Sequence, residues 1–205
     1  DFLVEAGELV WSQAGTGIIH DETPAIIGQT VHGIQLFINL TSKNKHTKPY
    51  VFHLKNEEIS IYQDESNNYI RVLSGNYNKV ISIINPAEEL DFLDISLNDK
   101  IDYLLKSNWN LTIYLIAGSI DINSKANNKN IILNKNEAIS IQSIDEEIKI
   151  DLLSLTEDTH FLIVAGPSQY EPVATYGPFI MNTETELKDA YDGYRFGQMG
   201  RLSKL

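Results

Sequence analysis

Short segments in which apolar and polar residues alternate recur along most of the chain. A period of two places successive side chains on opposite faces of an extended backbone, so it predicts half-buried β-strands. The clearest predicted strands are 33–40, 69–73, 111–116, 130–133, 138–142, 148–153 and 161–164, with turn signals at 75–76 and 127–130. A spacing of about 8–12 residues between such segments is typical of β-sandwiches and barrels. We therefore expect an all-β fold.

One helix is expected near the C-terminus. Thr183 and Glu186 have the spacing of a capping box, in which the hydroxyl accepts a backbone N–H and the carboxylate reaches back. An apolar stripe at helical spacing follows, formed by Leu187, Ala190, Tyr191 and Tyr194. Gly197 is placed to end the helix. The stripe predicts a short helix that docks on the body of the protein.

Charge and cysteine content narrow the classes of partner. The chain has 205 residues and a formal net charge of −12, which disfavours direct binding to nucleic acid and to anionic membranes. No apolar run approaches the roughly 18 residues that a membrane-spanning helix requires. The absence of cysteine excludes disulfides, thiolate metal sites and cysteine nucleophiles, and it fits a cytoplasmic location.

The segment 11–22 holds the one arrangement of residues with evident chemistry. His20 and Glu22 are two residues apart, so on an extended strand their side chains point to the same face, while Asp21 points away. An imidazole and a carboxylate on one face can share a metal ion. Gly15 and Gly17 would let the backbone turn tightly just before the pair. The plainer alternative is a solvated strand end.

Longer motifs add a family resemblance. Residues 6–24 resemble the end of the N-terminal cupin of pirins, and His20 and Glu22 fall on the positions of the last two metal ligands there. Residues 31–40 are similar to a further pirin strand, while 171–173 and 176–183 are similar to the closing motif of the family. These motifs extend over nearly the whole chain, so the chain resembles the pirin family.

The resemblance implies two cupin domains, each a jelly-roll β-barrel, with the first incomplete and a short C-terminal helix. It assigns 1–60 to the C-terminal part of the metal-binding cupin, 61–170 to the second cupin and 171–205 to a closing segment with the helix. Pirins resemble other cupins in taking their first two metal ligands from a His-x-His on an earlier strand, which this sequence lacks. We therefore expect a fragment of a longer pirin.

The other histidines receive plainer interpretations. His32 is expected to be packed and hydrogen-bonded, His46 to be exposed, and His160 to stand at a strand entrance. His53 is a candidate replacement ligand without further support. Because the second cupin contains only His160, it should not carry an independent His-rich metal site.

The resemblance also implies candidate functions and leaves open whether the chain is an enzyme. As a quercetin 2,3-dioxygenase, the intact protein would hold a mononuclear divalent metal, with iron favoured, and would open a flavonol-like molecule with O₂. His20 and Glu22 would be metal ligands, and Glu22 would also be catalytic by taking a substrate proton. The alternatives are a metal-dependent adaptor that binds a protein partner, or a metal-free truncated pirin. An enzyme predicts an apolar pocket of about 300–1,000 Å³ at His20 and Glu22, whereas an adaptor predicts a large exposed patch.

Overall fold

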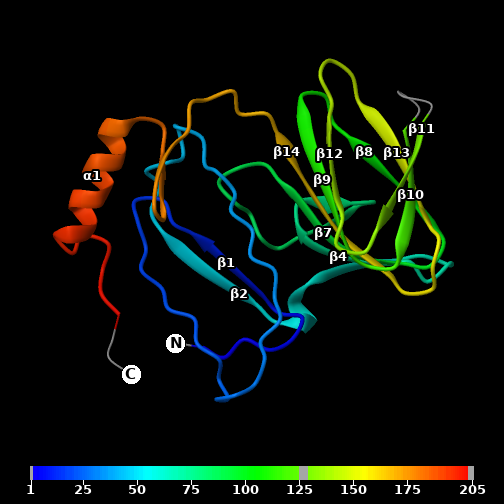
Figure 1. Cartoon of the computed structure of the whole chain (residues 1–205), viewed down its shortest axis with the longest axis horizontal. Helices are drawn as coiled ribbons and strands as arrows, with labels where there is room; N and C mark the ends of the chain where they lie inside the picture. The colour runs from blue at the N-terminus through cyan, green and yellow to red at the C-terminus, as the bar shows by residue number, and fades with distance from the viewer. Residues whose placement is uncertain (1, 125–128, 203–205) are drawn as a thin grey trace. The chain divides into compact units, whose positions relative to one another are not determined.

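A computed structural model of the chain describes residues 2–124 and 129–202. The chain divides into two compact units, one central and one formed by the two ends of the chain (Figure 1). The central unit consists of residues 57–168. The terminal unit combines residues 1–56 with residues 169–205. None of the helices in the described ranges is long and apolar enough to cross a membrane. The domain bounds expected from the sequence stay predictions.

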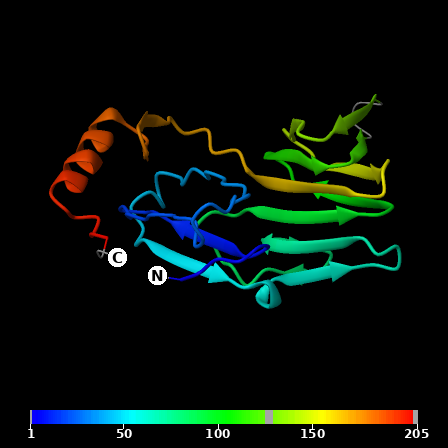
Figure 2. The ribbon, with the colours of Figure 1, turned by 60° about the horizontal axis from the view of Figure 1, so that its bottom comes forward.

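The central unit is built from antiparallel strands in two main sheets. The six-stranded sheet has the order β12 (Ala138–Gln142), β9 (Trp109–Ala117), β14 (Thr159–Pro167), β7 (Asp91–Leu97), β4 (Tyr69–Ser74), β3 (Ser60–Gln63). The four-stranded sheet has the order β11 (Lys129–Asn134), β10 (Ser119–Ser124), β13 (Ile148–Ser154), β8 (Lys100–Leu105). A small hairpin joins β5 (Asn76–Tyr77) to β6 (Val80–Ile81), and the 3-10 helix η1 (Asn56–Glu58) precedes β3. In Figure 2 the green to yellow strands of this unit run side by side.

The core of the central unit follows from the alternation in its strands. In β8 the side chains of Ile101, Tyr103 and Leu105 are buried, while those between them are exposed. Strand β9 behaves in the same way, and both sheets contribute to one apolar cluster that includes Leu105 and Phe161. Two sheets that enclose one core form the jelly-roll arrangement, in which the inward residues alternate with polar outward ones.

The central unit contains a buried carboxylate, that of Asp91. Asp91 is buried, and its Oδ2 accepts a hydrogen bond from the Tyr103 hydroxyl at 2.9 Å. Its Oδ1 accepts from the Asn76 backbone N–H at 3.2 Å. Gly75 has a φ of +75°, and a Cβ atom there would lie 2.0 Å from Asp91 Oδ1, so the glycine makes room for the carboxylate. Burial raises the pKa of Asp91, and these hydrogen bonds offset only part of that effect.

Asp91→Asn should become more stable relative to the wild-type protein as pH rises. Because the pKa of Asp91 is raised by folding, its contribution to stability is fully present below the unfolded pKa of about 3.9. That contribution is lost as pH rises through the folded-state pKa, whereas asparagine stays neutral. Urea unfolding at steps between about pH 4 and pH 7 would measure the difference. Trp109 fluorescence in a Trp11→Phe background would follow the central unit. If the stability of Asp91→Asn relative to the wild-type protein fell as pH rose, the raised pKa of Asp91 would be contradicted.

The terminal unit contains two small sheets and one helix. Strand β1 (Leu9–Gln13) pairs with β2 (Tyr50–Leu54), and β15 (Ala174–Tyr176) pairs with β16 (Phe179–Met181), both antiparallel. Helix α1 (Glu184–Arg195) follows β16 directly. The stretch between β1 and β2 forms turns and irregular chain.

The helix prediction is confirmed. Thr183 is the N-cap residue and accepts the Glu186 backbone N–H at 3.2 Å, while the Glu186 carboxylate accepts from the Asn182 backbone N–H at 3.2 Å. Gly197, with a φ of +74°, donates its N–H to the Tyr194 carbonyl just past the end of α1. Leu187 is buried, and the Tyr191 ring meets Phe179 of β16 edge-on. The helix therefore docks on the hairpin β15–β16.

Six predicted strands lie within observed strands, but the predicted strand at 33–40 is wrong. Residues 33–40 are irregular, and Ile34, Leu36 and Phe37 are exposed. A strand needs a neighbour for its backbone N–H and C=O groups. No pairing to 33–40 occurs among the strands of the described residues. The turn predicted at 75–76 coincides with the start of β5, whereas the one at 127–130 lies partly outside the described residues.

Candidate functional site

The predicted pair follows a tight turn in the irregular chain after β1. Gly15 has a φ of +51° and Gly17 a φ of +125°, and the Gly17 N–H donates to the Ala14 carbonyl at 2.8 Å. His20 Nδ1 then lies 3.4 Å from Glu22 Oε1, so the two side chains converge. Both are exposed, by 51% for His20 and 72% for Glu22.

The donor set supplied by this pair is incomplete for a mononuclear metal. An imidazole nitrogen and a carboxylate oxygen are suitable donors, but catalytic metal sites in proteins usually have at least three protein ligands. No group of three or more His, Asp or Glu side chains suited to a metal occurs within 2–124 and 129–202. The described residues alone therefore do not fit such a centre, and the ligand roles of His20 and Glu22 stay a prediction.

His53 belongs to a different pair. Its Nε2 lies 2.8 Å from Glu8 Oε2, both side chains are largely buried, and the Phe2 ring stacks on the imidazole at 4.6 Å. The Glu5 backbone N–H and the His53 ring lower the pKa of Glu8. The contact thus links the residue before β1 to His53 of β2, and it occupies one of the two imidazole nitrogens that could bind a metal.

Two other histidines match their interpretations and one does not. His46 is exposed as expected, with Nε2 3.8 Å from Glu186 Oε1. His160 is the second residue of β14, close to the expected strand entrance. The prediction for His32 is wrong, since this residue is exposed. The chain around it forms no strand that could bury its side chain.

Arg71, Asp94 and His160 form a polar trio on the six-stranded sheet that was not predicted from the sequence. Asp94 Oδ1 lies 2.6 Å from His160 Nε2, and its Oδ2 accepts from Arg71 at 2.7 Å. Burial alone would raise the pKa of Asp94, but the hydrogen bonds and charges of His160 and Arg71 outweigh it, so the pKa is lowered. The strand register sets Arg71 opposite Asp94, and this pairing arises from the fold rather than from a local pattern in the sequence.

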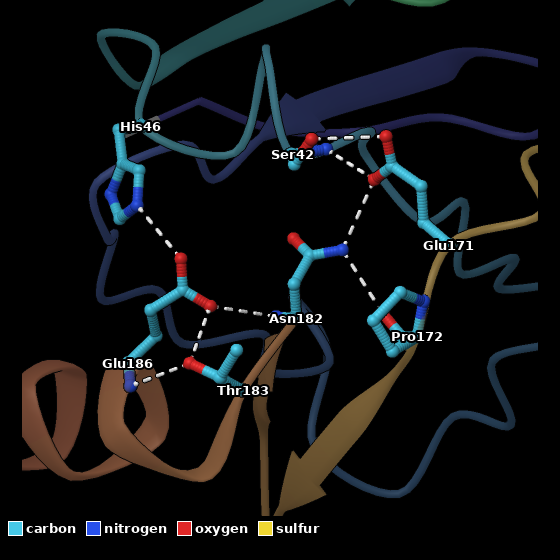
Figure 3. Close-up of polar contacts among 7 residues, drawn as sticks. All are labelled: Ser42, His46, Glu171, Pro172, Asn182, Thr183 and Glu186. Carbon is cyan, nitrogen blue, oxygen red and sulfur yellow. Dashed lines mark hydrogen bonds and ion pairs between the residues drawn. The ribbon is translucent and has the colours of Figure 1, made fainter.

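Hydrogen bonds join the closing motif, residues 171–173 and 176–183, to the loop before β2 (Figure 3). The Glu171 carboxylate accepts from the Ser42 backbone N–H at 2.6 Å and from the Ser42 hydroxyl at 2.9 Å. The Asn182 side-chain amide donates to Glu171 at 3.1 Å and to the Pro172 carbonyl at 3.0 Å. The bonds from Ser42 are the main cause of a lowered pKa at Glu171. The motif therefore orders the first and last parts of the terminal unit around each other.

The two-sheet jelly roll of the central unit is the fold of the cupin class of β-proteins. The family assignment is more specific, because residues 92–200 match the profile described as the pirin C-terminal cupin domain. The chain belongs to the pirin family, which confirms the resemblance in the motifs and the all-β cupin fold with its short C-terminal helix.

Individual relatives agree with this assignment. The chain is 28% identical to a tomato pirin-like protein over 204 residues, covering 96% of this chain and 66% of the relative. It is 29% identical to human pirin over 202 residues, covering 95% and 66%. The solved quercetin 2,3-dioxygenase of Acinetobacter baumannii superposes with a TM-score of 0.68 at 25% identity, covering 81% of this chain and 56% of that one. The chain thus spans 66% of the length of both pirin relatives.

Proposed function

We propose that His20 and Glu22 are two ligands of a mononuclear divalent metal, with iron favoured, in a quercetin 2,3-dioxygenase-type oxidoreductase. The observation that carries the proposal is the 3.4 Å approach of His20 Nδ1 to Glu22 Oε1. This approach occurs within the run of residues that resembles the metal-binding segment of pirins. The likeness to the Acinetobacter baumannii quercetin 2,3-dioxygenase supports a flavonol as the substrate class.

The chain's own residues have limited roles in this proposal. The metal would supply a site where flavonol and O₂ meet. His20 and Glu22 would bind it through one nitrogen and one oxygen, and additional donors would complete the centre. Glu22 is the proposed catalytic residue, because an exposed carboxylate can accept a proton from a phenolic hydroxyl of the substrate.

A second candidate is a metal-dependent adaptor that binds a protein. Exposed apolar side chains favour it, because they are frequent between residues 26 and 38, where Ile27 and Phe37 are the most exposed. His20 and Glu22 are themselves exposed by 51% and 72%, and the Ile19–Phe196 pocket and the Thr175–Tyr191 pocket of the described residues are lined by other side chains. This pattern fits a binding surface better than an enclosed flavonol site.

The two candidates separate in one set of measurements on the protein as isolated from its own cells. Intact mass and metal content would be determined on one sample, and quercetin consumption under air would be followed before and after chelation. About one metal per chain with chelator-sensitive consumption supports the dioxygenase. About one metal without consumption supports the adaptor. A metal-free protein would refute both and leave the truncated, metal-free alternative.

A further inference from the structure

A pocket of about 470 Å³ lies in the terminal unit, and neither His20 nor Glu22 is among the residues that line it. Its apolar and aromatic wall is formed by Ile19, Tyr194, Phe196 and Leu202. Phe196 is one of the most exposed aromatic side chains of the described residues, although it lies in a concave site. The volume is within the range of about 300–1,000 Å³ that small-molecule sites occupy.

Arginine is concentrated at this pocket. The sequence contains three arginines, and Arg195 and Arg201 both line it, although the formal net charge of the chain is −12. Within the described ranges Arg71 forms an ion pair with Asp94, whereas neither Arg195 nor Arg201 has a carboxylate oxygen within 4.0 Å. Two guanidinium groups without an anionic partner in an acidic protein favour an anionic occupant.

The position of Arg195 in the last turn of α1 does not account for both arginines. A cation there can neutralise the negative end of the helix dipole. The carbonyls of this turn, however, already accept backbone N–H groups of residues 196–198 at 2.9–3.0 Å. Arg201 lies beyond the helix, and its guanidinium is close to Gly197, where a Cβ atom would lie 3.8 Å from Nη2.

The two sides of the pocket are packed closely together. Gly17, two residues before Ile19, has a φ of +125°, and a Cβ atom there would lie 2.5 Å from Met199 Sδ. Met199 is part of the same C-terminal stretch as Arg195 and Arg201. Side-chain packing therefore holds the Ile19 loop against this stretch, which gives the pocket a defined shape.

We propose that this pocket binds an aromatic carboxylate. A guanidinium group matches a carboxylate in a planar, two-bond geometry, and the second arginine adds charge. The ring of the ligand would pack on Phe196 and Tyr194, where aromatic pairs are favourable. Ile19 of the pocket precedes His20 in the chain, but neither His20 nor Glu22 lines the pocket, so failure of this proposal would leave the metal proposal intact.

The test uses 2-naphthoate as the probe, titrated into the full protein and followed by calorimetry. We expect saturable binding that weakens about tenfold in Arg201→Gln and in Arg195→Gln, as expected when one charge-assisted hydrogen bond is removed. The neutral 2-naphthalenemethanol should also bind about tenfold less tightly to the wild-type protein. Lys188→Gln is the matched control, because it removes one positive charge from α1 outside this pocket and should leave binding unchanged.

Three outcomes would overturn the proposal. The first is no saturable binding of 2-naphthoate, and the second is equal affinity for the neutral alcohol. The third is equal weakening by Lys188→Gln and Arg201→Gln, which would show a general charge effect. Circular dichroism of each variant would establish that it folds, and both arginines are exposed, so their removal should not affect a core. Arg201→Lys should retain part of the affinity, since it keeps the charge and loses the two-bond geometry.

Discussion

Leu105→Ala should lower the unfolding free energy of the central unit by about 3–5 kcal/mol. Leu105 is 0% exposed at the end of β8, opposite Ile148 of β13, and belongs to the apolar cluster between the two sheets. Removing three carbons there loses their transfer free energy and leaves a cavity that a close-packed interior cannot fully refill. Urea unfolding followed by Trp109 fluorescence in a Trp11→Phe background would measure the change, because Trp109 is buried in this unit.

The neighbouring leucine provides the control. Leu104 is in the same strand but points to the other face and is 50% exposed. Leu104→Ala removes the same atoms from a largely solvated position, so it should cost within about 0.5 kcal/mol. Similar losses in the two variants would mean that the alternation in β8 does not decide which face is buried, and the two-sheet core would need revision.

Several strands of the central unit could be predicted because apolar and polar residues alternate along them. The segments 138–142 and 148–153 alternate regularly, and β12 and β13 coincide with them to within one residue. The helix could be predicted for a different reason, since its capping box and its terminal glycine act locally. Neither signal depends on contacts with distant parts of the chain.

The segment 33–40 shows where such reasoning fails. Its apolar residues are those of a β-strand, but strand formation also requires a neighbour for the backbone. Within the described residues no strand is paired with this segment, so the same side chains remain exposed. The pattern of one segment cannot reveal whether its partner is available.

In the candidate site, too, contacts between residues close in sequence could be predicted, whereas contacts between distant residues could not. The approach of His20 to Glu22 could be predicted, because side chains two residues apart can point to the same face. The contact of Ser42 with Glu171 crosses 129 positions, and that of Asp94 with His160 crosses 66. These pairs arise from the fold, and no local pattern marks them. The family motifs marked residues 171–173 as part of the closing motif, and the contacts show that Glu171 binds the loop before β2 through Ser42.

His20→Ala should lower metal affinity at least about 100-fold if the proposed centre exists in the intact protein. Loss of an outer-shell partner alone costs about 10–100-fold, and a direct ligand contributes more. Glu22→Gln should have a similar effect, because an amide oxygen carries no charge to match the metal. Equilibrium dialysis of the isolated protein against the metal, followed by measurement of bound metal per chain, would give the affinities.

His32→Ala is the matched control for this pair, since His32 is also an exposed histidine of the irregular chain between β1 and β2. It should bind metal as the wild-type protein does. Wild-type metal content in His20→Ala would show that the 3.4 Å pair is only an exposed contact between side chains. An equal loss of metal affinity in His32→Ala and in His20→Ala would contradict a ligand set that includes His20 and excludes His32.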